Sequence, residues 1–337
     1  MKVLGIETSC DECSAAVVED GKRILSNVIA TQIEFHKPYY GVVPEIASRK
    51  HLEWIDPVIE ESLREAGVGL DGVDVIAATY RPGLVGSLLV GLCYAKGLAL
   101  AAGRPFVGVD HIQAHLYAPH LGEEIAYPYI GVIVSGGHTM IALVRSYDRF
   151  EILGATIDDA CGEALDKVAK FYDLGYPGGV AIDRLAKSGR AEAFNFPKPS
   201  LHKGDHRYDV SYSGLKTAAV NQIDQFWDRR YEKSKENIAA AFQKAAIDII
   251  VDRALLAVDD TGIRTVVAGG GVSANSYLRA RLGSEAGLRA VFPPMKLCTD
   301  NGAMIAGLAW HYHVTGRDSG WDLNAQARVP GFRKLYP

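Results

Sequence analysis

The sequence has little cysteine, and the cysteines are not spaced as a disulfide framework. There are five among 337 residues, and they lie far apart at Cys10, Cys13, Cys93, Cys161 and Cys298. An odd, scattered set is not typical of a disulfide-stapled secreted domain. Cys10 and Cys13 form a C-x-x-C pair, but no second pair completes a zinc site. We therefore interpret these two as incidental thiols and expect no disulfides.

We also expect neither a secretion signal nor a membrane span. Residues 1–7 enter an expected strand at once, which leaves no room for the charged and apolar regions of a signal peptide. The most apolar run, residues 84–102, contains Lys96 and many small residues. Such a run is a poor membrane span and a good buried or interface helix. We expect a cytoplasmic protein with no membrane association.

The excess of acidic over basic residues is small as well. The formal net charge is −4, with 23% charged and 48% hydrophobic residues. This balance is that of a soluble globular protein, and it argues against a chain that coats nucleic acid indiscriminately, although a local basic patch remains compatible with it. The length allows two domains with their own cores.

Two stretches of the sequence repeat the same order of elements. A strand at residues 3–7, a polar turn at 8–12 and a hairpin over 14–29 return as a strand at 129–134, a loop at 135–139 and a hairpin over 140–154. This predicts an α/β protein of two lobes with the layout of the superfamily of actin, the heat-shock chaperones and the sugar kinases (ASKHA). We expect RNase H-like lobes at 1–126 with 301–337 and at 127–300, and a nucleotide cleft between them.

Glycine-rich loops follow two expected strands of the second lobe. In Ser135-Gly136-Gly137-His138, paired glycines would let backbone N–H groups approach a phosphate, although a single Gly-Gly is usually only a turn. Gly269 to Gly271 lead from a strand into a helix, which would place helix N-terminal amides beside a nucleotide. Asn275 offers a donor and an acceptor to a base or sugar.

Acidic residues lie on both sides of a tight loop at residues 175–179. Asp166 and Asp183 would suit hydroxyl recognition, for example on a ribose, but acids on helix surfaces are more often only solvated. A further helix, expected over residues 235–256, is assigned to the core because its apolar side chains recur at helical spacing.

Two histidines stand four residues apart on an expected helix. His111 and His115 would project from one face, yet two ligands are too few for a tight metal site. Taken alone, the pair slightly favours one histidine packed in the core and the other at the surface. Ile112 replaces the glutamate of the H-E-x-x-H zinc proteases, so a peptidase is disfavoured. Asp300 could be a helix N-cap. If the last helix returned to the first lobe, however, Asp300 would complete a set that suits Fe(II), Zn(II) or Mn(II).

Taken in order, these motifs resemble the TsaD family of tRNA N6-adenosine threonylcarbamoyltransferases, formerly described as O-sialoglycoprotein endopeptidases. The resemblance covers nearly the whole chain. It runs through residues 5–12, 42–49 with His51, 82–91, His111 with His115, 134–139, 158–167, 175–179, 213–217, 269–275 and 298–306.

The resemblance implies roles for particular residues. His111, His115 and Asp300 would hold one divalent metal ion, with Fe(II) expected and Zn(II) or Mn(II) as alternatives. Asp11 and Glu12 would stand near the reacting group. An adenylate-bearing substrate would contact Val134, Ser135, Gly136, Gly137, His138, Asp166, Gly179, Asp183 and Asn275.

It also implies an activity and partners. The threonylcarbamoyl group would pass from threonylcarbamoyl-AMP, made by a separate synthase, to the N6 amine of the adenosine 3′ of the anticodon, in tRNAs that read codons beginning with A. A TsaB-like homologue would form a heterodimer on the small-residue helices, and a TsaE-like ATPase would join them. The chain departs from the family pattern at Arg81, Gln113 and Val180, none of which is an expected ligand.

Two other functions fit the same fold. A small-molecule kinase would use Mg²⁺ on carboxylates, which the two histidines disfavour because Mg²⁺ prefers oxygen ligands. A non-catalytic nucleotide-dependent scaffold is the other alternative, disfavoured by ligand sets in both lobes. For tRNA, phosphate contacts are expected from a basic tract, or else this tract is only solvated surface; its members are Lys198, Lys203, His206, Arg207, Arg229 and Arg230.

Overall fold

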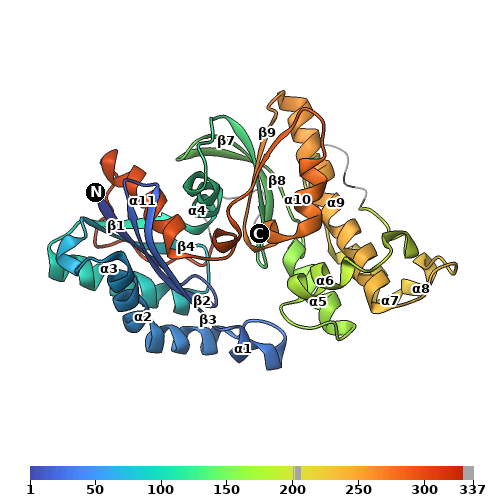
Figure 1. Cartoon of the computed structure of the whole chain (residues 1–337), viewed down its shortest axis with the longest axis horizontal. Coiled ribbons are helices and arrows are strands. Elements are labelled where there is room, and N and C mark those ends of the chain that lie inside the picture. Colours follow the sequence, from blue (N-terminus) through green and yellow to red (C-terminus); the bar gives the residue numbers. More distant parts are fainter. Residues whose placement is uncertain (200, 202–205, 329–337) are drawn as a thin grey trace. The chain divides into compact units, whose positions relative to one another are not determined.

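The chain folds into two compact units in the computed structural model, which describes residues 1–199, 201 and 206–328 (Figure 1). The first unit contains Met1–Ile125 and the described residues from Pro293 onward. The second unit is Ala126–Phe292. The boundaries predicted from the sequence lie after residues 126 and 300. The chain returns earlier because Pro294 packs against Gly122, whose added Cβ would lie 2.9 Å from the proline Cδ. Asp300 therefore belongs to the first unit.

The first unit is built on a mixed sheet of five strands in the order β3-β2-β1-β4-β5. β1 pairs antiparallel with β2 and parallel with β4. Because parallel strands end at the same edge, Glu7 at the end of β1 and Asp110 at the end of β5 lie along one edge of the sheet. The strands are β1 (Lys2–Glu7), β2 (Glu12–Glu19), β3 (Arg23–Thr31), β4 (Val75–Arg81) and β5 (Phe106–Asp110).

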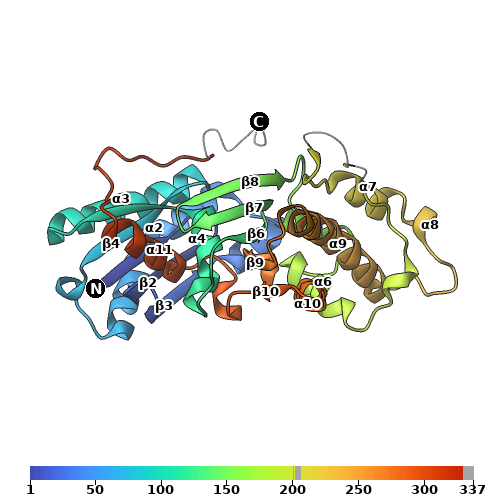
Figure 2. The same ribbon diagram turned by 90° about the horizontal axis from the view of Figure 1, so that it is seen from above.

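The second unit repeats this sheet. Its strand order is β10-β9-β6-β7-β8, with β6 antiparallel to β7 and parallel to β9, and Figure 2 shows the strands side by side. Each strand occupies the place of its counterpart in the first sheet, so the predicted repeat is confirmed. The strands are β6 (Tyr129–Val134), β7 (Thr139–Ser146), β8 (Arg149–Ala155), β9 (Thr265–Gly269) and β10 (Arg289–Val291).

Helices cover both faces of the first sheet. α2 (Pro44–Ala66) and α3 (Val85–Ala102) pack on one face, and α11 (Gly302–Val314) lies on the other (Figure 1). An added Cβ on Gly5 would lie 2.4 Å from the backbone nitrogen of Ala306, so α11 and β1 meet backbone to backbone. The Gly302 N–H donates to Ser14 Oγ (2.8 Å), and Ser14 is paired with Glu7. This contact brings the residues before α11 to the Glu7 edge.

The second unit is organised around α9 (Lys235–Thr261), the longest of its helices in the described residues. Its buried side chains include Phe242 and Ile249, so the predicted core helix is confirmed and extends further than expected. The other helices are α5 (Cys161–Phe171), α6 (Gly178–Ala186), α7 (Ser213–Asn221), α8 (Ile223–Phe226) and α10 (Ser276–Gly283); the first unit also has α1 (Ile33–His36) and α4 (His111–Tyr117).

α3 keeps an apolar face exposed. It is the one helix in the described part of the chain with the length and composition of a membrane span, which is weak evidence because core helices of soluble proteins pass the same test. Val85, Leu89, Cys93 and Gly97, four residues apart, are all exposed, and Leu100 is 70% exposed. We name these five residues the α3 stripe. All five cysteines are free, as predicted.

Candidate metal centre and nucleotide site

The two histidines lie at the start of α4, directly after β5. The Asp110 carboxylate caps this helix by accepting the N–H groups of Ile112 (3.0 Å) and Gln113 (3.2 Å). Both imidazoles are buried, and their ring centroids are 4.5 Å apart. The spacing i, i+4 has therefore placed both rings on one face of a helix whose first turn is held by a buried carboxylate.

Asp300 meets the two rings. Its Oδ1 lies 3.0 Å from His115 Nε2 and 3.6 Å from His111 Nε2. One ligand atom from each of the three side chains can be chosen so that all lie within 4.8 Å of one another. The N-cap of α11 is Asn301, whose side chain accepts from the Met304 N–H at 3.0 Å, so Asp300 does not have the capping role that was its alternative reading.

A buried glutamate stands behind His111. Glu7 is fully buried, and its Oε2 lies 3.1 Å from His111 Nδ1. Ser9 N–H and the Thr79 hydroxyl donate to the same carboxylate at 2.5 and 2.6 Å. A carboxylate on one ring nitrogen leaves the other nitrogen to a metal, which is the usual support of a metal-ligating histidine. Sequence analysis missed Glu7; an acid inside an apolar strand was the available signal.

The charges of this cluster favour a cation. Burial lowers the pKa of His111, but the carboxylates of Asp300 and Glu7 outweigh it and raise the pKa to about 9. His115 Nδ1 is buried and has no hydrogen-bond partner among the described residues, so His115 is poorly satisfied as a plain core residue. Two imidazoles and a carboxylate are a donor set that Fe(II), Zn(II) and Mn(II) accept. The residues therefore fit a divalent ion.

Two further carboxylates, the predicted Asp11 and Glu12, belong to the same unit. Burial raises the pKa of Glu12 well above its usual value, and the negative charges of Asp11 and Asp300 raise it further. Thr31 Oγ1 donates weakly to Glu12 at 3.4 Å. Mutual repulsion of this kind is relieved by a bound cation or a proton.

In the second unit, the predicted phosphate loop is a tight turn after β6. The Ser135 N–H donates to the His138 carbonyl (2.8 Å), and the His138 N–H donates to Ser135 Oγ (3.0 Å). An added Cβ on Gly136 or Gly137 would have no atom within 4 Å in the described structure, so the turn has an open side. Val134, the residue before it, is fully buried and ends β6.

The glycine triplet adjoins this loop. Gly270 has φ +88°, and an added Cβ would lie 2.5 Å from the Val134 carbonyl oxygen. Only glycine allows both the conformation and the approach. The loop after β6 and the loop after β9 are therefore in contact, as expected for two strands that end side by side.

The predicted polar ligands Asp166, Asp183 and Asn275 each accept hydrogen bonds at the start of a helix. Asp166 Oδ1 accepts the N–H groups of Gly178 (2.7 Å) and Gly179 (3.3 Å) at the start of α6. Asp183 Oδ1 accepts Ser276 N–H and Oγ–H at 3.1 and 2.7 Å. Asn275 uses its Oδ1 to cap α10 through Leu278 N–H at 3.0 Å.

Gln243 of α9 joins Asp183 to Asn275. Its Nε2 donates to Asp183 Oδ1 (3.0 Å) and to Asn275 Oδ1 (3.2 Å). These bonds occupy Asp183 Oδ1 and Asn275 Oδ1 within the protein. Asp183 Oδ2 and Asn275 Nδ2 remain as an acceptor and a donor for a ligand. Gln243 is 3% exposed, and sequence analysis placed its helix in the core without giving this residue a role.

The family model of tRNA N6-adenosine threonylcarbamoyltransferases, TsaD, matches residues 23–307. The chain belongs to this family. The tRNA N6-adenosine threonylcarbamoyltransferase of Treponema denticola is 61% identical over 99% of both chains. That of Treponema pallidum is 52% identical over 99% of this chain and 95% of its own, and that of Borreliella burgdorferi 48% over 100% and 96%. The predicted family and transferase class are confirmed, and the chain is a tRNA-modifying transferase.

Solved structures show the fold. HypF has a TM-score of 0.61 at 17% identity, over 97% of this chain and 47% of its own. The component A of (R)-2-hydroxyglutaryl-CoA dehydratase from Acidaminococcus fermentans has a TM-score of 0.56 at 15% identity, over 93% and 99%. The two repeated mixed sheets and these likenesses confirm the predicted ASKHA-type α/β fold.

Proposed function

We propose that this TsaD-family chain transfers the threonylcarbamoyl group of threonylcarbamoyl-AMP to the N6 amine of the adenosine 3′ of the anticodon, in tRNAs that read codons beginning with A. The convergence of His111, His115 and Asp300, supported by Glu7, is the observation that carries the proposal. These side chains give a member of this transferase family a site for one divalent ion, for which Fe(II) is proposed first and Zn(II) or Mn(II) as alternatives.

The first unit handles the reacting group in this proposal. His111, His115 and Asp300 would hold the ion, which would supply Lewis-acid polarisation of the donor oxygens. The N6 nitrogen attacks the carbamoyl carbon, the bond from that carbon to the phosphate oxygen breaks, and AMP leaves with the electron pair. Glu12, with Asp11 as the alternative, accepts the proton that the amine loses. Burial raises the pKa of Glu12, which makes its carboxylate a better proton acceptor than an exposed one.

The second unit binds the adenylate. Backbone N–H groups of the Ser135 to His138 turn would bind the phosphate, on the side that Gly136 and Gly137 leave open. Asp166 with Gly179 would position the sugar. Asp183 Oδ2 and Asn275 Nδ2 would accept from and donate to the ribose or base.

Gln243 provides a test of this assignment. Gln243→Leu removes both hydrogen bonds that orient Asp183 and Asn275, and we expect the dissociation constant for AMP to rise roughly tenfold. A modest loss of stability is expected too, since two hydrogen bonds of a buried side chain are removed, although Asp183 and Asn275 each keep another donor. Isothermal titration with AMP and a thermal melt measure both. Gln243→Glu is the comparison, because it would repel Asp183. Unchanged AMP affinity in both variants would reject the positioning of this pair by Gln243.

Partners are proposed on the α3 stripe. Five exposed small or apolar residues, spaced along one helix face without a charged residue, suit a second protein with a matching helix surface. We assign this face to a TsaB-like homologue in a heterodimer. A TsaE-like ATPase, a separate threonylcarbamoyl-AMP synthase and a cytoplasmic location complete the proposal, on the strength of the family.

The direct experiment is a transfer assay. The purified chain, with its TsaB-like and TsaE-like partners, is incubated with unmodified tRNA and threonylcarbamoyl-AMP, and nucleosides are analysed by mass spectrometry. Threonylcarbamoyladenosine at the position 3′ of the anticodon is expected, together with about one transition-metal ion per chain by elemental analysis. Phosphorylation of a small metabolite with no tRNA product would favour the kinase alternative and overturn the proposal.

A further inference from the structure

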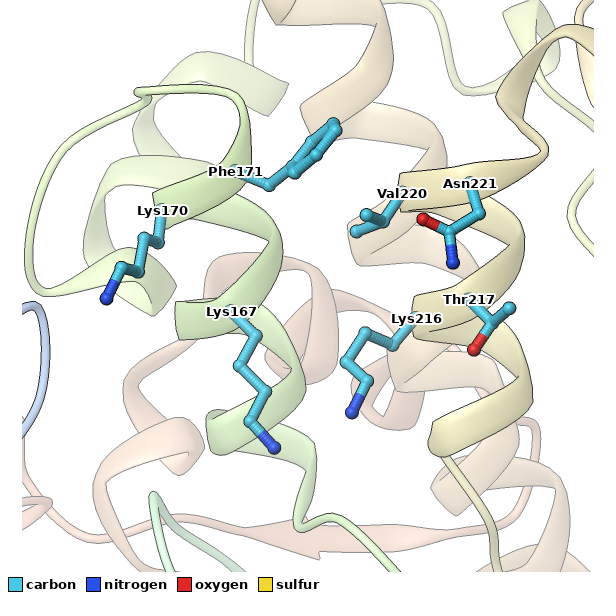
Figure 3. A pocket seen from close by; sticks show the side chains of 7 residues that line it. All are labelled: Lys167, Lys170, Phe171, Lys216, Thr217, Val220 and Asn221. Carbon is cyan, nitrogen blue, oxygen red and sulfur yellow. The ribbon is translucent and has the colours of Figure 1, made fainter.

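A groove between α5 and α7 lies outside the residues assigned so far. It encloses about 490 Å³ and is lined by three lysines and by four other side chains, two of them apolar (Figure 3). Tyr172 follows α5, and its hydroxyl donates to the Ala219 carbonyl in α7 at 2.6 Å. This bond ties the end of one helix to the other and fixes the width of the groove.

One end of the groove is cationic. Lys167 Nζ donates to Asp159 Oδ1 (3.0 Å) and Glu163 Oε1 (2.8 Å), and Lys216 donates to the other oxygen of Asp159. Figure 3 shows both lysine side chains extending toward the same end. Asp159 thus holds two ammonium groups together. Each ammonium has three N–H donors, so both keep donors for a further anion.

The lysines of this groove lie close to acidic side chains but keep N–H donors. Lys167 and Lys216 contact two carboxylates, Asp159 and Glu163, and Lys170 adds a third lysine to the lining. In the basic tract predicted from the sequence, four members have an acidic partner: Lys198 with Asp252, His206 with Asp209, Arg207 with Asp260 and Arg230 with Asp228. The Arg229 guanidinium instead lies 5.9 Å from the centroid of the Trp227 ring. Lys203 lies outside the described residues.

The other end of the groove carries an exposed aromatic ring. Phe171 is 55% exposed, and Val220 lies across from it on α7. The exposed Asn221 offers an amide beside them. A solvent-facing aromatic ring next to lysines is the arrangement on which proteins stack unpaired bases while holding the adjoining phosphates.

The cationic end adjoins the proposed phosphate turn of the donor site. The Gly162 N–H at the start of α5 donates to the Ser135 carbonyl (3.2 Å), and the Cys161 N–H donates to Thr139 Oγ1 (2.8 Å). Asp159 is two residues before Cys161. A substrate strand with its adenosine near the donor could therefore continue into the groove.

We propose that the α5–α7 groove binds an unpaired stretch of the tRNA substrate, with a backbone phosphate at Lys167 and Lys216 and a base stacked on Phe171. The inference rests on the proposed function, which makes tRNA the acceptor. The polyanionic backbone matches the lysine end, and the face of a base matches the aromatic end.

The test measures tRNA binding apart from transfer. Phe171→Ala in the complete complex is expected to raise both the dissociation constant and the KM for unmodified tRNA roughly tenfold. Phe171→Trp should restore them, because indole also stacks. Lys216→Gln should lower the slope of log affinity against log salt by about one. Lys233→Gln, a lysine of the same unit outside the groove, is the matched control. Affinity for AMP and metal content should stay unchanged in all four.

The outcomes separate the groove from the proposed function. If the wild-type complex makes no threonylcarbamoyladenosine, the proposed function fails, whatever tRNA binding shows. If it does, and Phe171→Ala and Lys216→Gln keep wild-type tRNA affinity, the groove assignment is overturned. The assignment is also overturned if these variants raise only the KM for threonylcarbamoyl-AMP, or if they weaken binding of a partner protein and not of tRNA.

Discussion

Asp300→Ala is expected to remove the bound metal and the transfer activity together. It deletes one of three converging ligands, and two imidazoles alone are too few for a tight site. Metal affinity should fall by at least about 100-fold, and transfer by on the order of 10²–10³ or more. Elemental analysis and the transfer assay measure the two losses in the same preparation.

The protein should fold normally without Asp300. In the absence of an ion, the Asp300 carboxylate adds negative charge beside Glu12 and Glu7 and helps to raise the pKa of Glu12. Its removal ends that repulsion and also the contacts with His111 and His115, so a thermal melt of metal-free protein should show a stability close to that of wild type. Full transfer by the metal-free variant would refute the role of the three ligands.

Glu7→Gln is the matched comparison, because all three ligands remain. The amide is a weaker acceptor for His111 Nδ1–H. Because loss of such support typically weakens metal binding, we expect the metal affinity to fall by about 10–100-fold. Glu7 also accepts from Ser9 and Thr79, so a modest loss of stability is expected too. We therefore expect metal affinity to decrease in the order wild type, Glu7→Gln, Asp300→Ala.

The second large effect is expected at the α3 stripe. Leu89→Asp places a charge in the middle of the exposed apolar face, and burying it against a partner without a counter-ion should weaken the heterodimer roughly 100-fold or more. The variant should fold normally, because Leu89 is 37% exposed. Titration of the separately purified TsaB-like partner measures the loss.

A control for this variant is available on another helix. Val314→Asp alters an apolar residue that is 46% exposed at the end of α11, outside the α3 stripe, and should leave the heterodimer intact. Equal affinity of Leu89→Asp and wild type for the partner would place the interface elsewhere on the first unit.

Much of this protein followed from local patterns. The repeat of strand, polar loop and hairpin predicted two sheets of one topology, because alternation and turn residues are readable over short stretches. The i, i+4 spacing put His111 and His115 on one face for the same reason. The glycines after β6 and β9 indicated loops of open backbone, and the order of the motifs indicated the family.

Other features depend on contacts between distant segments. Whether Asp300 was an N-cap or a neighbour of the histidines turned on α11 packing against Gly5, which no local pattern encodes. Glu7 and Gln243 were missed because a polar residue inside an apolar strand or helix shows its partners only when both sides of the fold are present. The pairing of Lys198 with Asp252 and of Arg207 with Asp260 was likewise hidden, because both acids come from α9.

The sequence by itself determined the elements, their repetition and the types of group available for chemistry, since these depend on neighbours along the chain. Tertiary structure alone decided which of those groups meet, which oxygen or nitrogen of each is used internally and which faces a ligand. The reason is physical: hydrogen bonds and charges act over a few ångströms in space, and only the packed chain sets those distances.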